Sequence, residues 1–247
     1  MTKKKKIFLG IVSATLVGIL IIGLYLIRPV LKAKVLEGDG ECVVLIHGFL
    51  ATPFFMDRMA DFLNTNGYQT VNVDYPSTKY DIEDISDKYL EPAIRYCEDK
   101  KVNFVTHSMG GLILRYYLKD NQPDNLGRIV MLAPPNKGSE IANVLNREGL
   151  AKTALGPAIS ELETGYQDSL PTIDIKYLEI GIIAGNTSLE PIKPFIIPGE
   201  DDGLVSVEST KLANMKDFLV LPVGHTLMPD NPEVKKRTLN FMKDGKF

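Results

Sequence analysis

A single serine, Ser108, stands in a setting that favours nucleophilic chemistry. It lies between a predicted strand and a predicted helix, at the centre of residues 105–111. A serine at such a sharp turn projects its hydroxyl group at the carboxyl edge of a sheet, and the residues two before and two after it must be small. Gly110 keeps the usual Gly-x-Ser-x-Gly pattern, whereas Thr106 replaces the first glycine. The motif predicts Ser108 as a catalytic nucleophile.

A nucleophilic serine needs a base, and the chain has only three histidines. His107 belongs to the turn around Ser108, and His47 belongs to a second motif near the first predicted strand. His225 remains, directly after the last predicted strand. A catalytic histidine has this place when the order along the chain is serine, acid, histidine. We therefore predict His225 as the base.

An acid is expected between Ser108 and His225, on the loop that follows the penultimate strand. It would hold the histidine in the correct tautomer and stabilise the imidazolium ion. Residues 199–205 contain three candidates, Glu200, Asp201 and Asp202. An ordinary solvated acidic turn would explain the three acids but not their position on this loop. The residues alone leave the choice among the three open.

The second motif is His47-Gly48-Phe49, which directly follows an apolar run. In hydrolases with a serine turn of this kind, two backbone N–H groups hold the oxyanion that forms during acyl transfer. One comes from the loop after the early strand and the other from the residue after the nucleophile. We predict the N–H groups of Phe49 and Met109 for this role.

Short apolar runs alternate with helical patterns along the rest of the chain, which predicts a mostly parallel sheet with helices on both faces. The first predicted helix starts at Thr52-Pro53 and ends at Asn66-Gly67, and Pro92 predicts an irregularity in the second. The predicted strands are 42–46, 70–74, 103–107, 128–132, 178–184 and 218–221, and the other predicted helices are 82–98, 109–118 and 232–242.

Two segments keep two interpretations each. Residues 136–175 lack strong strand signals, so they form either a lid or cap over the carboxyl edge of the sheet or an ordinary peripheral helical segment. Phe54, Phe55 and Met56 follow the loop that contains Phe49, and they either line an acyl pocket or belong to the core under the first helix.

The composition limits the classes of partner. The chain has 247 residues, of which 45% are hydrophobic, and its net charge is -3, so it suits one sizeable domain. We find no basic patch interleaved with aromatic residues, no glycine-rich phosphate loop and no Cys/His cluster with metal-ligand spacing. The sequence therefore predicts no nucleic-acid partner and no metal.

The first thirty residues differ from the rest. Lysines occupy positions 3–6, and 7–27 is an uncharged apolar run long enough to cross a bilayer. We find no good cleavage site after it, so we predict an uncleaved transmembrane anchor (1–30), a tether (31–40) and a catalytic domain (41–247). The lysines slightly outnumber the basic residues on the other flank, which predicts a single-pass protein with an extracytoplasmic domain.

Together, these residues resemble the α/β-hydrolase superfamily, and more narrowly bacterial lipases and esterases. The resemblance extends over residues 40–245 and includes 71–77, 133–139 and 203–209. Many lipases have Asp-Gly followed by apolar residues in the acid loop, which favours Asp202. The resemblance implies an eight-stranded, mostly parallel sheet, from which this chain could lack the first strands. It also implies cleavage of carboxylic esters of lipid or acyl type through an acyl-enzyme, without a cofactor.

Three rival functions remain: an acyltransferase with the same residues, a thioesterase or amidase, and a membrane-anchored binding protein without catalysis. The implied fold places Cys42 and Cys97 near the amino edge of the sheet, away from the chemistry. They either form a disulfide, which an extracytoplasmic domain would permit, or are two small buried apolar residues.

Overall fold

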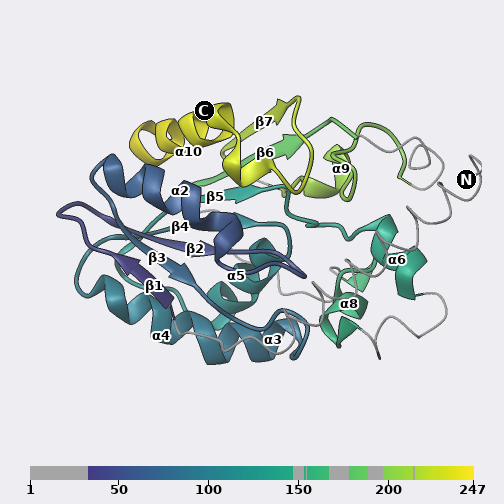
Figure 1. Ribbon diagram of the computed structural model, residues 1–247, viewed down its shortest axis with the longest axis horizontal. Coiled ribbons are helices and arrows are strands. Elements are labelled where there is room, and N and C mark those ends of the chain that lie inside the picture. The colour runs from purple at the N-terminus through teal and green to yellow at the C-terminus, as the bar shows by residue number, and fades with distance from the viewer. Residues whose placement is uncertain (1–32, 147–152, 154, 167–177, 189–196, 214) are drawn as a thin grey trace, which may run out of the picture. The chain divides into compact units, whose positions relative to one another are not determined.

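The computed structural model describes residues 33–146, 153, 155–166, 178–188, 197–213 and 215–247. In this part of the chain, seven strands form one sheet with helices on both faces (Figure 1). The strands are β1 (Ala33–Leu36), β2 (Cys42–Ile46), β3 (Gln69–Val73), β4 (Val102–His107), β5 (Leu126–Leu132), β6 (Ile180–Gly185) and β7 (Asp217–Leu221). Each of the six predicted strands is present, with bounds shifted by no more than a few residues.

The strand order is β1-β3-β2-β4-β5-β6-β7, and every neighbouring pair is parallel except β1 and β3. The carboxyl ends of β2 to β7 therefore meet at one edge of the sheet. In open α/β sheets this edge is where ligands bind. The loops that follow β2, β4, β6 and β7 contain the residues predicted to do chemistry.

Two hydrophobic cores hold the helices to the sheet. Helices α2 (Phe54–Thr65) and α10 (Pro232–Asp244) cover one face, and α5 (Met109–Asp120) covers the other (Figure 1). Successive residues of a strand point to opposite faces, so Val43 packs in the core under α2 and α10 while Val44 packs in the core with α5. Burial on both faces explains why the central strands are rich in apolar residues, of which β2 is a continuous run.

The predicted helix at 82–98 is a chain of four short helical pieces. These are α3 (Ile82–Ile85), the π-helix η1 (Ser86–Leu90), α4 (Glu91–Ile94) and the 3-10 helix η2 (Arg95–Cys97). Pro92 has no N–H group to donate to the preceding turn, and the wider π-helical turn lies directly before it. The predicted irregularity is therefore present, as a change of helix type.

The predicted tether, 31–40, differs from the structure. Its residues Ala33–Leu36 form β1, which pairs antiparallel with β3 at the edge of the sheet. The strand has only four residues, and the second of them is the exposed Lys34. It therefore has no apolar run from which a strand could be predicted. Val35 still packs against the core. The folded domain thus begins before residue 41.

Cys42 and Cys97 form a disulfide, with their Cα atoms 5.5 Å apart. Cys42 begins β2 and Cys97 ends η2, and both side chains are fully buried. The bond lies at the amino end of β2, whereas the chemistry-bearing loops follow the carboxyl ends. Of the two interpretations of the cysteines, the structure has the disulfide.

The segment predicted as a membrane anchor, 1–30, lies outside the described residues. Among the helices of the described ranges, none is long and apolar enough to cross a membrane. Residues 136–175 are described only in part. The described part contains helices α6 (Glu140–Asn146) and α8 (Ala158–Glu161). The remaining short helices are α9 (Val207–Thr210) and η6 (Met228–Asp230).

Candidate active site

Ser108 is the residue between β4 and α5, and its backbone is strained. Its φ is 53° and its ψ is −126°, a region that residues with a side chain rarely adopt. Its N–H group donates to the carbonyl of Leu132 at 2.9 Å, so β5 supports the turn. Gly110 is required here, because a Cβ atom on it would lie 2.4 Å from the carbonyl oxygen of Ile46. The tight strand-turn-helix predicted from the sequence is present.

Thr106 replaces the usual glycine near the end of β4, and its side chain is fully buried. Gly111 lies next to it: a Cβ atom added there would lie 3.4 Å from Thr106 Oγ1 and 2.9 Å from the Cβ of Pro134. The closer of these contacts is with Pro134, so a larger residue at 111 would displace the segment after β5. The structure thus accommodates threonine at 106, with glycine at both 110 and 111.

His225 and Asp202 form a buried pair. His225 Nδ1 lies 2.7 Å from Asp202 Oδ2, and the N–H group of His225 donates to the carbonyl of Asp202 at 2.9 Å. The other carboxylate oxygen, Asp202 Oδ1, accepts from the N–H groups of Leu204 and Val205, at 3.0 and 2.8 Å. The two backbone donors hold Oδ1, so that Oδ2 faces the imidazole ring, and the main-chain hydrogen bond holds the two residues side by side.

The neighbouring acids point elsewhere. Asp201 accepts a hydrogen bond from the N–H group of Gly203 at 2.7 Å and forms an isolated β-bridge with Ser206, so it shapes the loop. Glu200 is exposed, and its carboxylate accepts a hydrogen bond from Asn186 Nδ2 at 3.5 Å. Of the three candidate acids, Asp202 is the one whose carboxylate contacts His225.

The electrostatics of the pair favour an ionised carboxylate. Burial on its own would raise the pKa of Asp202, because a buried charge loses its hydration. The attraction of His225, the hydrogen bond with it and the two backbone N–H donors outweigh burial, so the pKa of Asp202 lies below its usual value. The carboxylate is therefore negative at neutral pH, as an acid that orients a histidine must be.

The His47-Gly48-Phe49 loop passes directly against the serine. A Cβ atom on Gly48 would lie 2.9 Å from the Cβ of Ser108. Phe49 lines the same cavity as Ser108. Met109 is the first residue of α5, where N–H groups have no partner within the helix and the helix dipole favours negative charge. Both predicted oxyanion donors thus belong to backbone next to Ser108.

Tyr75 was not predicted from the sequence, and it supports this loop. Its ring stacks on His47 with centroids 3.9 Å apart, and its hydroxyl group donates to the carbonyl of His47. The imidazole of His47 in turn donates from Nδ1 to the carbonyl of Gly48 at 2.9 Å. The available signal was the position of Tyr75, soon after the end of β3 at the same sheet edge.

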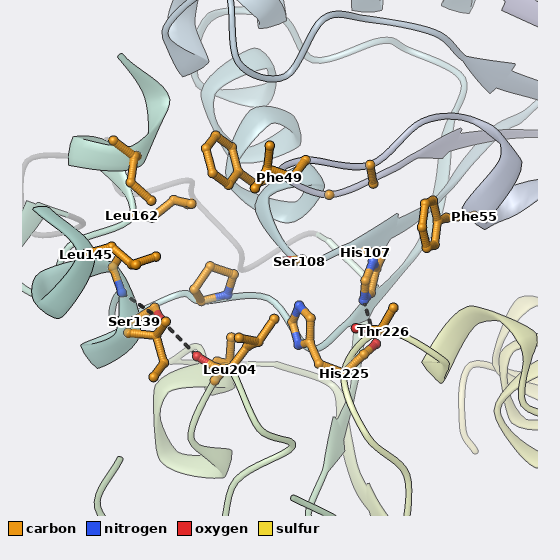
Figure 2. Close-up of a pocket in the computed structure, with 18 residues that line it drawn as sticks. Phe49, Phe55, His107, Ser108, Ser139, Leu145, Leu162, Leu204, His225 and Thr226 are labelled. Atoms are coloured by element: carbon orange, nitrogen blue, oxygen red, sulfur yellow. Dashed lines mark hydrogen bonds between the residues drawn. The ribbon is translucent and has the colours of Figure 1, made fainter. Parts of the chain in front are cut away.

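A cavity of about 300 Å³ opens over Ser108 and His225 (Figure 2). One wall follows β2 and includes Phe49, Leu50 and Phe55, and the opposite wall comes from α6, α8 and their loops. The second wall consists mainly of apolar side chains, which are Ile141, Ala142, Leu145, Ile159 and Leu162. The described parts of 136–175 therefore form a wall of the site.

Hydrogen bonds join this wall to the acid loop. Ser139 Oγ donates to the carbonyl of Leu204 at 2.8 Å, and its N–H group donates to the carbonyl of Leu162 at 2.8 Å. Nearby, the buried guanidinium of Arg115 donates to the side chain of Asn136 at 3.2 Å. The segment after β5, part of the motif at 133–139, thus links the cavity wall to α5 and to the loop of Asp202.

The described residues contain no group of three or more His, Cys, Asp or Glu side chains that could hold a metal ion. The polar groups at the cavity are the hydroxyl groups of Ser108, Ser139 and Thr226, the imidazoles of His107 and His225, and backbone N–H groups. Such a set can perform nucleophilic attack, proton transfer and stabilisation of an oxyanion.

Comparison with known families agrees with this geometry. The family model described as the alpha/beta hydrolase fold matches residues 41–169, more than half of the chain. The chain belongs to the α/β-hydrolase family. The matched part of this α/β-hydrolase includes Phe49, Ser108 and Met109.

Solved structures share the fold of this α/β-hydrolase at low sequence identity. A lipase from Bacillus licheniformis in its mature form is 21% identical, with 87% of this chain and 98% of that chain covered and a TM-score of 0.67. A phospholipase from Legionella pneumophila is 16% identical (83% and 60% covered, TM-score 0.65). An esterase from Exiguobacterium antarcticum is 15% identical (86% and 95% covered, TM-score 0.59).

Proposed function

We propose that this protein is a serine hydrolase that cleaves carboxylic esters of lipid or acyl type, with Ser108 as nucleophile, His225 as base and Asp202 as the orienting acid. The observation that carries the proposal is the Asp202–His225 pair, joined at 2.7 Å beside the cavity that Ser108 also lines. A strained serine and a carboxylate-bound histidine at one apolar cavity are what acyl transfer needs.

The proposed reaction begins with attack of Ser108 Oγ on the acyl carbonyl, while His225 Nε2 takes the hydroxyl proton. Asp202 accepts from Nδ1–H, which leaves Nε2 as the basic nitrogen and stabilises the imidazolium ion. The N–H groups of Phe49 and Met109 hold the oxyanion. His225 then protonates the leaving alcohol, and a water molecule, deprotonated by His225, releases the acyl group from Ser108.

The cavity and its rim support an apolar acyl substrate. The wall from α6 and α8 is apolar, as described above, and it suits an acyl chain. Three exposed apolar side chains line the cavity, Leu50, Phe55 and Leu145, and exposed Phe54, Val144 and Leu227 are each adjacent in the chain to a lining residue. Arg58 of α2 and Asp230 of η6 form an ion pair at 3.3 Å, so the helix that begins at Phe54 lies beside the turn that follows Leu227. Exposed apolar side chains that gather in this way mark a surface for contact with a membrane or another protein, and with an apolar acyl substrate we favour the membrane.

The N-terminal segment fits the same substrate class. The apolar run at 7–27 would anchor the enzyme in a membrane, close to lipid esters, with the domain on the extracytoplasmic side. A buried disulfide is expected in an oxidising compartment and therefore favours this orientation. Membrane fractionation of the full chain, followed by protease digestion of intact cells, tests both points.

The first experiment is labelling of the full chain with a fluorophosphonate probe, with Ser108→Ala as the control. We expect rapid labelling of the wild type and none of the variant, because the probe reacts only with an activated serine. A folded wild-type protein that takes no label would contradict the proposal and leave the non-catalytic binding protein.

A series of chromogenic esters of increasing chain length then measures the acyl preference. Thioester and amide substrates separate a thioesterase or amidase from an esterase, and analysis of products in the presence of added alcohol separates hydrolysis from acyl transfer. We expect turnover to rise with chain length until the acyl chain fills the cavity.

A further inference from the structure

We propose that His107 is a positioning residue: its Nε2–H group holds the main-chain carbonyl of His225 and so helps to place the catalytic imidazole. The inference rests on the proposed function, since it takes His225 as the base. His107 precedes the nucleophile in the chain, but it contacts the base, which is far from it in sequence.

The contact is direct and buried. His107 Nε2 lies 3.1 Å from the carbonyl oxygen of His225, and the two rings are 4.8 Å apart between centroids (Figure 2). A carbonyl oxygen can only accept, so the hydrogen must be on Nε2. His107 Nδ1 is buried and has no hydrogen-bond partner in the described residues. One tautomer, neutral with Nε2–H, satisfies both observations.

This contact adds to the hydrogen bonds that fix the main chain and the ring of His225. The N–H group of His225 donates to the carbonyl of Asp202, and its Nδ1 contacts Asp202 Oδ2. The carbonyl of His225 accepts from the N–H group of Met228 at 3.3 Å, which is a long hydrogen bond, and from His107 at 3.1 Å. Without His107, the weaker of these two bonds alone would hold the carbonyl side of His225.

A positioning residue beside the base must also remain uncharged. Burial above all, and repulsion from His225, lower the pKa of His107 to about 3. Asp202 and His47 are the other titratable groups that act on it, Asp202 raising this pKa and His47 lowering it. His107 is therefore neutral when His225 becomes an imidazolium ion, so it adds no like charge 4.8 Å from that ring.

Two substitutions separate the hydrogen bond from the packing. His107→Gln keeps an N–H donor at about the reach of Nε2, whereas His107→Phe keeps a ring of similar size without the donor. In the full chain acting on a soluble chromogenic ester, we expect His107→Phe to lower kcat by roughly 10- to 100-fold with little change in KM, because a small misplacement of a catalytic group has that effect. We expect His107→Gln to keep most of the activity.

The measured turnover of each variant is divided by the fraction of the protein that a fluorophosphonate labels. This correction removes the contribution of unfolded protein, which would otherwise lower the apparent kcat. The proposal would be overturned if His107→Phe had the same kcat as the wild type, or if His107→Phe and His107→Gln lost kcat equally. If Ser108→Ala keeps the wild-type turnover, the proposed function itself is wrong. If Ser108→Ala is inactive and His107→Phe is fully active, only the positioning role of His107 is wrong.

A second measurement is made on the wild-type protein and uses a variant only to assign the signals. With ¹⁵N-labelled histidine, the ring nitrogen shifts of His107 should report Nε2–H and an unprotonated Nδ1 throughout pH 5 to 9, with the signals assigned by their loss in His107→Gln. A hydrogen on Nδ1, or titration of His107 within that range, would overturn the proposal even if the phenylalanine variant fails to fold.

Discussion

At the residue scale, adjacent aspartates in the acid loop have different partners. Asp202 contacts His225, whereas Asp201 accepts from the backbone of its own loop. Asp202→Asn keeps the shape but favours the wrong tautomer of His225, so we expect kcat to fall by roughly 10⁴-fold, as in other enzymes with this arrangement. Asp201→Asn is the matched control, because an amide oxygen can still accept from Gly203. Steady-state kinetics with a soluble ester decide between them, and similar losses in both variants would contradict the assignment of Asp202.

His107 also makes a prediction about stability. Its pKa is about 3 in the folded protein and about 6.5 in the unfolded chain. Between these values the unfolded chain binds more protons, so the folded state loses stability as the pH falls below 6.5. Relative to His107→Gln, we expect the wild type to lose about 1.4 kcal/mol for each pH unit. Urea unfolding from pH 6.5 to 4.5 measures this difference, and parallel pH dependences of the two proteins would refute it.

At the element scale, the disulfide joins the start of β2 to the end of η2 across a separation of 55 residues. Closing a loop of that length lowers the entropy of the unfolded chain, which corresponds to about 4 kcal/mol of stability. We expect Cys42→Ala/Cys97→Ala to lose about this free energy of unfolding and to keep its kcat at temperatures where it is folded, because the bond lies away from the carboxyl edge. Urea unfolding with and without reductant measures it. Two free thiols in the denatured, unreduced wild type would contradict the bond.

At the scale of the whole catalytic domain, the exposed apolar rim should matter only when the substrate is in a lipid aggregate. Phe54 is 73% exposed and begins α2, and Leu227 is 65% exposed and directly precedes η6; their neighbours Phe55 and Thr226 line the cavity. We expect Phe54→Ser/Leu227→Ser to lower turnover of an ester in vesicles about tenfold or more, since each buried side chain contributes about 1.5–3 kcal/mol. Turnover of a soluble ester should stay unchanged.

Tyr96 provides the control for the rim. It is also exposed, at 43%, but it belongs to η2, near the amino edge of the sheet. Tyr96→Ser should leave both activities as they are. Equal effects of the rim variant on vesicle and soluble substrates would show that Phe54 and Leu227 act on the site itself rather than on lipid.

The sequence alone determined the features that depend on local sterics and patterning. The strand-turn-helix around Ser108 needs small residues at fixed spacing, and the central strands are rich in apolar residues because both faces are buried. The prediction of His225 as the base followed from its place after the last strand and from the small number of histidines. The turn and the strands can be predicted from the sequence because each depends on residues adjacent in the chain.

The tertiary structure decided what depends on contacts between distant residues. The contact that separates Asp202 from Asp201 joins residues 23 apart, the disulfide joins residues 55 apart, and the contact of His107 with His225 joins residues 118 apart. β1 was hidden for the same reason, since four partly exposed residues become a strand only by pairing with β3. No local pattern encodes these pairings, because folding brings the partners together only when the sheet and its helices pack as a whole.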